Sequence, residues 1–170
     1  TKEVMSGDFF HTEDIGELDE DGFLFITDRK KQLFKTSGGK YVAPQLIENT
    51  MKQSRFIEQI MVMGEGEKMP TALIQPNFEF IKDWAARKEH PLGETNEEII
   101  KDQRIINRIQ KDVNYYNRKF GNWEQVKVFK LTPEVWTIDS GHLTPTLKIK
   151  RKIVKEMYID LYNEMYGHKD

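Results

Sequence analysis

Two short apolar runs separated by a polar turn constrain the fold of this chain more than any other feature of its sequence. Residues 60–63 and 72–74 are apolar without interruption, and residues 64–68 between them read Gly-Glu-Gly-Glu-Lys. Short apolar runs bounded by turn residues are typical of buried strands. Segments with a helical spacing of apolar residues precede and follow them. Hairpins, then strands interleaved with helices, predict an α+β domain in which helices pack on a small mixed sheet.

The first part of the chain is predicted to form hairpins. Within residues 15–27, the pair Asp21-Gly22 supplies a turn between Glu17-Leu18 and the apolar run at residues 23–26. A charged stretch follows at residues 28–31. Residues 33–35 and 41–42 then flank the sequence Ser-Gly-Gly-Lys, which predicts a second hairpin with a flexible tip.

Helices are predicted after the second hairpin. Pro44 suits a first helical turn, and we expect this helix to end near Ser54, with one apolar face formed by Leu46, Ile47 and Met51. Asn77 is expected to cap the next helix, which residues 90–93 stop, and whose apolar residues are Ile81, Trp84 and Ala85.

A long helix and a terminal helix are expected in the second half. Thr95 and Glu98 form a capping-box pattern, Gly121 is placed to end the long helix, and its apolar stripe is Ile105, Ile109, Val113, Tyr116 and Phe120. A strand at residues 126–131 and a stretch rich in Pro, Gly and Thr at residues 132–146 come next. The terminal helix has an apolar residue at every fourth position: Ile149, Ile153, Met157, Leu161 and Met165.

Charge and composition exclude several classes of function. Lys and Arg number 26 against 28 Asp and Glu, so the net charge of −2 argues against a general nucleic-acid binder. The absence of Cys excludes disulfides, thiolate zinc sites and thiol nucleophiles, and favours a cytoplasmic location. No apolar run approaches the roughly 18 residues that cross a bilayer, and the start lacks the features of a signal peptide. Because the chain begins with Thr1, we expect it to be a piece of a longer protein.

Metal and hydrolase sites are not predicted. The histidines are far apart, and the cluster of His11 with Glu13 and Asp14 is typical of a polar loop. The serines lack the nucleophile-elbow pattern of a hydrolase. We therefore assign no metal ligand and no Ser-His-Asp site.

Two contiguous segments resemble a known family. Residues 9–49 read FFHTEDIGELDEDGFLFITDRKKQLFKTSGGKYVAPQLIEN, and residues 143–151 read LTPTLKIKR. The first segment resembles the closing part of long-chain acyl-CoA synthetases, which are members of the adenylate-forming superfamily, and the second resembles the lysine loop of that family. The resemblance implies that residues 32–170 form the C-terminal lid domain. Residues 1–28 would then be the tail of the large N-terminal domain, with its hairpin, and residues 29–31 the hinge.

The resemblance assigns roles near the hairpin. It implies that Asp14 binds the ribose hydroxyls of ATP, where a carboxylate accepts short charge-assisted hydrogen bonds, and that Arg29 contacts the ribose region. Asp28 and Lys31 fall at the hinge about which the lid turns between the two half-reactions. The sequence departs from the family at Glu13, where the family has Gly.

The resemblance also assigns residues to each of the two half-reactions. Lys35, Gly38 and Gly39 belong to a loop that faces CoA in the second half-reaction, where glycines let the backbone approach a narrow ligand. Lys148 matches the lysine that stabilises negative charge while a fatty carboxylate attacks the α-phosphate of ATP. Lys150, Arg151 and Lys152 are expected to face solvent.

The resemblance implies a lid of an ATP-dependent long-chain fatty acid CoA ligase. The whole enzyme would use ATP, Mg²⁺ and CoA, and the fragment alone would be inactive. Its partners would be the N-terminal domain, ATP, fatty acid and CoA, with no nucleic acid and with peripheral membrane contact of the parent.

Other interpretations stay open at this point. One is a ligase for another carboxylate, such as an aryl or medium-chain acid. Another is a family fold that has lost its chemistry, to which Glu13 points. A third is a non-catalytic binding module that uses the basic face of one helix. Asp102 and Asp112 interrupt this face, and its basic residues are Arg104, Arg108, Lys111, Arg118 and Lys119.

Overall fold

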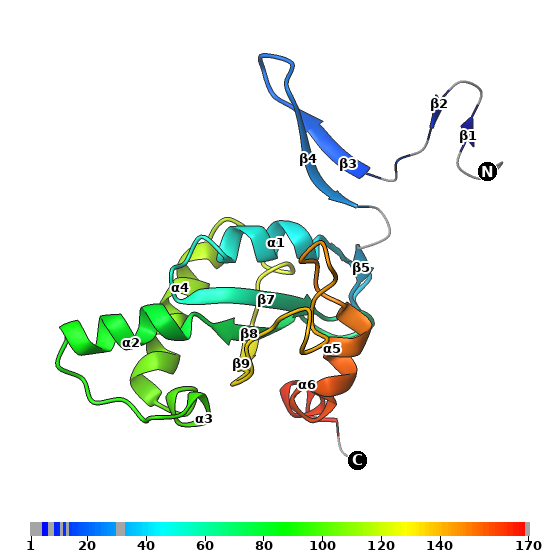
Figure 1. Cartoon of the computed structure of the whole chain (residues 1–170). Helices are drawn as coiled ribbons and strands as arrows, with labels where there is room; N and C mark the ends of the chain where they lie inside the picture. The colour runs from blue at the N-terminus through cyan, green and yellow to red at the C-terminus, as the bar shows by residue number, and fades with distance from the viewer. Residues whose placement is uncertain (1–4, 7–8, 11, 13, 30–32, 169–170) are drawn as a thin grey trace.

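The computed structural model describes residues 5–6, 9–10, 12, 14–29 and 33–168. Figure 1 shows the path of the chain, from short strand pairs at the N-terminus to paired helices at the C-terminus. The elements in chain order are β1 (Met5–Ser6), β2 (Phe9–Phe10), β3 (Asp14–Leu18), β4 (Leu24–Arg29), β5 (Phe34–Lys35), β6 (Tyr41–Val42), α1 (Pro44–Met51), β7 (Ile57–Met63), β8 (Thr71–Pro76), α2 (Phe78–Arg87), α3 (Asn96–Ile99), α4 (Gln103–Asn117), β9 (Val128–Leu131), α5 (Arg151–Met157) and α6 (Ile159–Tyr166).

A three-stranded mixed sheet forms the centre of the fold, in the order β7-β8-β9. Strands β7 and β8 are antiparallel, whereas β8 and β9 are parallel, with Thr71 opposite Val128. A parallel pair needs a long crossover, and the segment that carries α2, α3 and α4 provides it. The predicted α+β class and small mixed sheet are therefore confirmed.

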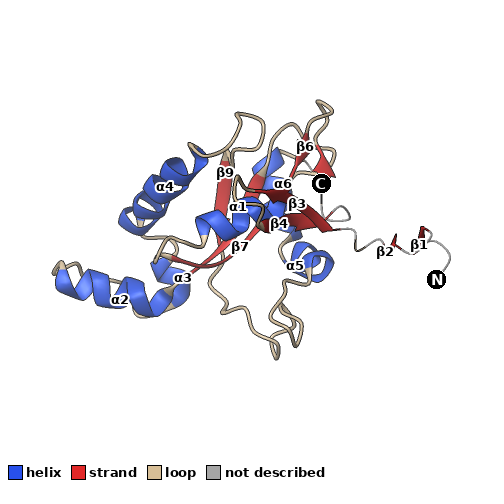
Figure 2. Ribbon diagram, turned by 90° about the horizontal axis from the view of Figure 1, so that it is seen from above, coloured by secondary structure: helices blue, strands red, loops and turns tan. Residues whose placement is uncertain are grey.

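Both faces of this sheet are buried, which explains why the runs at residues 60–63 and 72–74 are apolar without interruption. Alternate residues of a strand point to opposite faces. Ile60 and Val62 belong to a core cluster with residues of α1, α2 and α4, while Met61 and Met63 pack with residues of α5 and α6. In Figure 2, α2 and α4 lie to one side of the strands and α5 lies to the other.

The N-terminal hairpin was correctly predicted and is slightly longer than expected. Strands β3 and β4 pair antiparallel, and Asp19 Oδ1 accepts hydrogen bonds from the backbone N–H groups of Asp21 and Phe23 at 3.0 and 2.8 Å. Gly22 takes a φ of 86°, which few other residues adopt. Figure 1 shows this hairpin above α1. The second predicted hairpin is confirmed as β5 and β6.

The buried face of α1 differs from the expected one. Leu46 is exposed, and the helix instead buries Pro44, Ile47, Glu48 and Met51. These positions follow the i, i+3, i+4, i+7 spacing of a single helical face. A carboxylate therefore occupies a position that the pattern reserves for an apolar side chain.

The long helix predicted from Thr95 to Gly121 is two helices, and that prediction was wrong. The capping box of Thr95 and Glu98 is present, but α3 ends at Ile99 and α4 starts afresh after Asp102. Asp102 accepts a hydrogen bond from the Arg104 backbone N–H at 2.8 Å. Asp side chains favour caps because they bond the backbone N–H groups that a helix start leaves unpaired, and this local bond competes with a continuous helix.

The terminal helix is also divided, and its predicted apolar stripe is only partly right: Met165 is buried and Ile149 and Leu161 pack against the same core, but Ile153 and Met157 do not. Helix α5 ends at Met157 and α6 begins at Ile159. Ile153 and Met157 are 40% and 49% exposed, whereas the buried residues are Val154, Tyr162 and Met165. A strict four-residue repeat advances about 40° beyond a full turn at each step, so a long stripe of this kind winds off one face.

Replacement of the Asp102 cap should destabilise the fold. Asp102→Ala removes the acceptor for the Arg104 N–H and should lower the free energy of unfolding by about 0.5–2 kcal/mol. Asp83→Ala, the same change on the exposed surface of α2, should change it by less than about 0.5 kcal/mol. Urea unfolding of the two variants measures the difference. Equal effects would show that Asp102 does not cap α4.

Candidate functional site

The loop that carries Lys148 is closed by its own backbone. Leu143 and Ile149 form a β-bridge at its base. Within the loop, the Thr144 N–H donates to the Lys148 carbonyl at 2.8 Å, and the Lys148 N–H donates to Thr144 Oγ1 at 3.1 Å. Leu147 has a φ of 58°, which turns the chain sharply just before Lys148. We call residues 143–149 the lysine loop.

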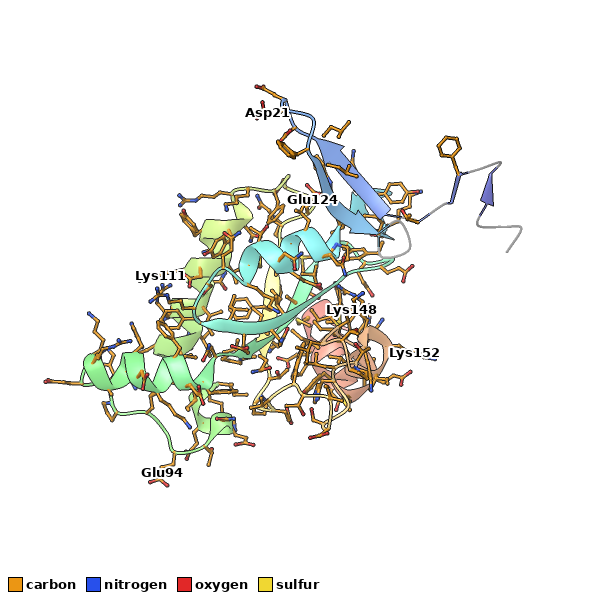
Figure 3. The ribbon with its side chains drawn as sticks, turned by 45° about the horizontal axis from the view of Figure 1, so that its top comes forward. Asp21, Glu94, Lys111, Glu124, Lys148 and Lys152 are labelled. Carbon is orange, nitrogen blue, oxygen red and sulfur yellow. The ribbon has the colours of Figure 1, made fainter. Side chains whose placement is uncertain are left out.

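The side chain of Lys148 is exposed (Figure 3). Within the part of the chain that the structure describes, no hydrogen bond or ion pair occupies its ammonium group. Lys148 lines a hollow of about 190 Å³, together with Gln45, Asn49 and Lys52 of α1 and its C-terminal end. The loop therefore holds the backbone in place and leaves the amine accessible.

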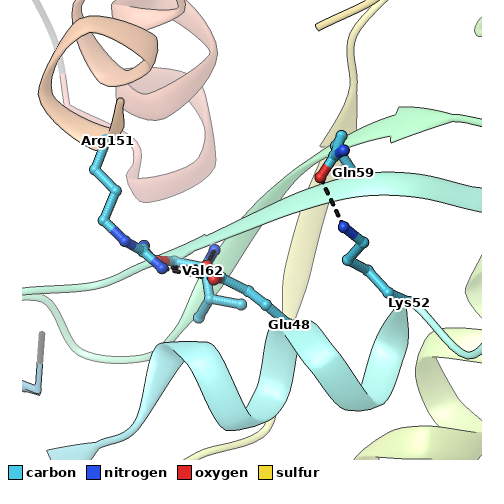
Figure 4. Close-up of polar contacts among 5 residues, drawn as sticks. All are labelled: Glu48, Lys52, Gln59, Val62 and Arg151. Atoms are coloured by element: carbon cyan, nitrogen blue, oxygen red, sulfur yellow. Dashed lines mark hydrogen bonds and ion pairs between the residues drawn. The ribbon is translucent and has the colours of Figure 1, made fainter. Parts of the chain in front are cut away.

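Arg151 is not the solvent-facing residue that the sequence suggested. Its Nη2 donates to both carboxylate oxygens of Glu48 at 2.6 Å, and its Nη1 donates to the Val62 carbonyl at 3.1 Å (Figure 4). Glu48 has only 8% of its side chain exposed. A buried carboxylate needs a charged partner, and the guanidinium that opens α5 provides one.

The same ion pair also forms hydrogen bonds with the backbone of an edge strand. Glu48 Oε1 accepts from the Val62 N–H at 2.7 Å, so both polar backbone groups of Val62 are bonded to the pair. The strand order leaves β7 at an edge, where such groups need partners. The sequence carried one signal for this arrangement, because Glu48 lies on the buried stripe of α1 four residues after Pro44.

The hairpin brings two of the predicted nucleotide contacts together. Backbone register places Asp14 directly opposite Arg29, and Ile15 opposite Asp28, at the open end of the hairpin. A register irregularity follows between Ile15 and Gly16. The predicted hinge residue Lys31 lies outside the described residues, as do Glu13 and His11.

The predicted CoA-side loop is a tight hairpin tip. The Thr36 N–H donates to the Lys40 carbonyl, and the Gly39 N–H donates to the Thr36 carbonyl, both at 2.9 Å. Gly39 has a φ of 78°, whereas Gly38 does not need a positive φ. The Lys35 ammonium lies over the Tyr41 ring, 5.6 Å from its centroid. Lys35, Gly38 and Gly39 therefore lie close together at this tip.

A second turn braces that tip. The Ser37 N–H donates to the Glu67 carbonyl at 2.9 Å, and the Gly66 N–H donates to the Lys35 carbonyl at 2.8 Å. The Glu67 carboxylate accepts from the Tyr162 hydroxyl at 2.9 Å, which connects the turn to α6. Burial raises the pKa of the Tyr162 hydroxyl, and the Glu67 carboxylate raises it further, so the hydroxyl keeps the proton that it donates.

The segment before the lysine loop is ordered by a buried aromatic stack. Trp136 stacks on His142 with ring centroids 5.6 Å apart. The imidazole of His142 lies 2.7 Å from Ser140 Oγ and 3.0 Å from the Tyr158 hydroxyl, which donates to Glu134 at 2.7 Å. Burial lowers the pKa of His142, and the Glu134 carboxylate acts in the opposite direction. This packing fixes Leu143, where the lysine loop begins.

The described residues provide neither a cluster of metal ligands nor a membrane-spanning helix. Among them, no group of three or more His, Asp or Glu side chains could hold a metal ion. No helix in this part of the chain is long and apolar enough to span a membrane.

The family of the chain follows from a sequence-family comparison. The model of the AMP-binding enzyme C-terminal domain matches residues 31–170. The chain belongs to this family. The match includes the lysine loop, the CoA-side loop and the whole mixed sheet.

Curated relatives are long-chain ligases and fatty acyl-CoA synthetases. The chain is 35% identical over 167 residues to long-chain-fatty-acid–CoA ligase FadD15 of Mycobacterium tuberculosis, covering 98% of this chain and 28% of the relative. It is 34% identical to long-chain-fatty-acid–CoA ligase 1 of Homo sapiens, covering 98% of this chain and 24% of the relative. The chain thus spans about a quarter of the length of these proteins.

Solved structures share the fold. The adenylation domain of a carboxylate reductase from Mycobacterium chelonae superposes with a TM-score of 0.76 at 24% identity, covering 98% of this chain and 24% of that one. The corresponding domain from Segniliparus rugosus, in complex with AMP and a carboxylic acid, gives 0.73 at 23% identity and covers 98% and 25%. Both likenesses cover 98% of this chain and therefore include the N-terminal hairpin as well as the mixed sheet.

The low pKa of His142 predicts a pH-dependent stability. Between its folded pKa and the unfolded value of about 6.5, the unfolded chain binds more protons, so stability rises with pH in this window. The contribution is complete above about pH 6.5 and is lost as the pH falls through the folded pKa. His142→Phe keeps an aromatic ring beside Trp136. Between pH 7.5 and 5, the melting temperature of this variant should fall by less than that of the wild type. An equal fall in both proteins would contradict the assignment.

Proposed function

We propose that this chain is the C-terminal lid of an ATP-dependent long-chain fatty acid CoA ligase. The observation that carries the proposal is the accessible amine of Lys148, on a loop closed by backbone bonds and anchored at its base. Membership of the AMP-binding C-terminal domain family and the names of the curated relatives support it. The chain spans only about a quarter of the length of these relatives, so we expect the fragment alone to be inactive.

The proposed domain division places the hinge at residues 29–31. Residues 1–28, with their hairpin, would belong to the large N-terminal domain, and residues 32–170 would form the lid. The family match, which begins at residue 31, supports this division. Asp28 and Lys31 would flank the backbone angles that change when the lid turns.

In the first half-reaction, the fatty carboxylate attacks the α-phosphorus of ATP and the bond to pyrophosphate breaks. Negative charge increases around phosphorus during this step, and the Lys148 ammonium would stabilise it in a closed site of low dielectric. Asp14 and Arg29, opposite each other in the hairpin, would hold the ribose. Mg²⁺ would neutralise phosphate charge when bound with ATP, and we assign it no ligand in this chain.

In the second half-reaction, the CoA thiol attacks the carbonyl carbon of the acyl-adenylate and AMP leaves. The lid would turn about the hinge, so that the loop with Lys35, Gly38 and Gly39 faces the pantetheine arm. The brace from Glu67 to Ser37 would keep this loop in one shape during the rotation. The partners of the lid would be the N-terminal domain, ATP, fatty acid and CoA, in a cytoplasmic enzyme with peripheral membrane contact.

The main alternative is a ligase for another carboxylate, such as an aryl acid. A solved anthranilate CoA ligase in complex with anthranoyl-AMP shares the fold with a TM-score of 0.61 at 19% identity. The higher identity to long-chain ligases favours a fatty acid. The binding-module alternative is weakened because Arg104 pairs with Asp102 and Arg108 pairs with Asp112, which neutralises part of the basic face.

Removal of the Lys148 ammonium should impair adenylation. In the full-length protein, Lys148→Ala should lower the rate of fatty-acid-dependent ATP–pyrophosphate exchange by about 10²- to 10³-fold, because an aimed cation is lost. Lys152→Ala, which removes an exposed cation from α5, serves as the control and should retain exchange. Undiminished exchange in Lys148→Ala would refute the role of this lysine.

A side chain at Gly39 should affect the second half-reaction. Gly39→Ala forces an L-residue to a φ of 78°, at a cost of about 1–2 kcal/mol, and should slow thioester formation from supplied acyl-adenylate by roughly five- to thirtyfold. Adenylation should stay close to the wild-type rate. Gly22→Ala imposes a similar backbone conformation at the hairpin turn and controls for strain alone. Equal thioester rates in the two variants would argue against a role for the Gly39 loop.

A further inference from the structure

We propose that Arg151 and Glu48 are positioning residues for Lys148. Their ion pair fixes the C-terminal end of the lysine loop to α1 and β7, so that the ammonium is presented from one defined place. The inference rests on the proposed function, because it concerns the half-reaction in which Lys148 acts.

The connection between Lys148 and Arg151 is short. Only Ile149 and Lys150 lie between them, so the Cα atoms of Lys148 and Arg151 can be at most about 11 Å apart. Ile149 belongs to the β-bridge with Leu143, and the Lys150 N–H donates to the His142 carbonyl at 2.9 Å. A displacement of the Arg151 backbone would therefore be transmitted to Lys148.

Packing and backbone bonds hold both ends of the lysine loop, and the second end has an ion pair in addition. Leu143 is buried, and its N–H donates to the Thr137 carbonyl at 3.1 Å, so packing secures the first end. The second end opens α5, where Lys150 makes no side-chain cap. There the guanidinium of Arg151 provides the long-range contact, through three hydrogen bonds to α1 and β7.

The pair also orients helix α1, whose residues line the same hollow as Lys148. Glu48 lies on α1 between Gln45 and Lys52, which line the same hollow as Lys148. Lys52 donates to Gln59 Oε1 at 2.9 Å, beside the Glu48–Arg151 contact (Figure 4). One ion pair therefore sets the relative position of the loop and of the helix beside it.

The geometry requires an arginine. One nitrogen of the guanidinium serves the Glu48 carboxylate while another serves the Val62 carbonyl. A lysine has a single nitrogen at the end of its chain and cannot reproduce this fork. Lys at position 151 would keep the charge that Glu48 needs but would release the β7 backbone.

The test uses the full-length protein and measures the two half-reactions separately. ATP–pyrophosphate exchange reports adenylation, and CoA with supplied acyl-adenylate reports thioester formation. Arg151→Met should lower kcat for exchange by about 10- to 100-fold, as a small misplacement of a reacting group does, with thioester formation within twofold of the wild type. Arg151→Lys, which preserves the charge, should show a smaller loss. Lys152→Met is the matched control and should show none.

The decisive comparison is made in the absence of the Lys148 amine. If Arg151 acts through Lys148, then Lys148→Ala/Arg151→Met should exchange no more slowly than Lys148→Ala alone. A purely structural role predicts that Arg151→Met lowers the rate by the same factor in both backgrounds and slows both half-reactions alike. Either of these results would overturn the inference.

Folding is controlled with a second variant. Glu48→Gln/Arg151→Met removes both charges, so that no unpaired carboxylate is left buried, and should fold with the same loss of exchange as Arg151→Met. Wild-type exchange in this double variant would overturn the inference while leaving the role of Lys148 intact. Wild-type exchange in Lys148→Ala would instead refute the proposed function, and the positioning role with it.

Discussion

The buried carboxylate of Glu48 is the constraint on which the arrangement of the helices around the mixed sheet depends. A charge at the interface between a helix and a sheet is stable only when it is paired and hydrogen-bonded, and Arg151 meets both needs. The two residues are 103 positions apart, so the contact joins the start of the domain to its last helices. Because the guanidinium also bonds β7, three elements meet at one point, and the lysine loop leaves from that point.

Much of the fold was predictable because local signals agreed with the tertiary structure. The apolar runs at residues 60–63 and 72–74 are strands buried on both faces, and Asn77 caps α2 as expected. The failures have physical causes. Asp102 starts a new helix inside a continuous helical pattern, and the four-residue repeat after Ile149 winds off the buried face, which Val154 and Tyr162 occupy instead.

The candidate site was predictable only where it is contiguous in sequence. The lysine loop and the Gly38-Gly39 tip were found because a short motif carries each of them. Arg151 was assigned to solvent, since a basic residue among basic neighbours gives no sign of a buried partner far away in the chain. The juxtaposition of Asp14 and Arg29 depends on the strand register, which composition and periodicity do not specify.

The distribution of buried side chains bears on the rotation that we propose about residues 29–31. The buried apolar residues whose burial the structure describes lie between Phe34 and Met165, nearly all of them in two clusters that sandwich the sheet. The proposed rotation about residues 29–31 would thus carry both clusters along as one block. The energetic cost of the proposed rotation would then come from a few backbone torsions near residues 29–31 and from changes in surface hydration.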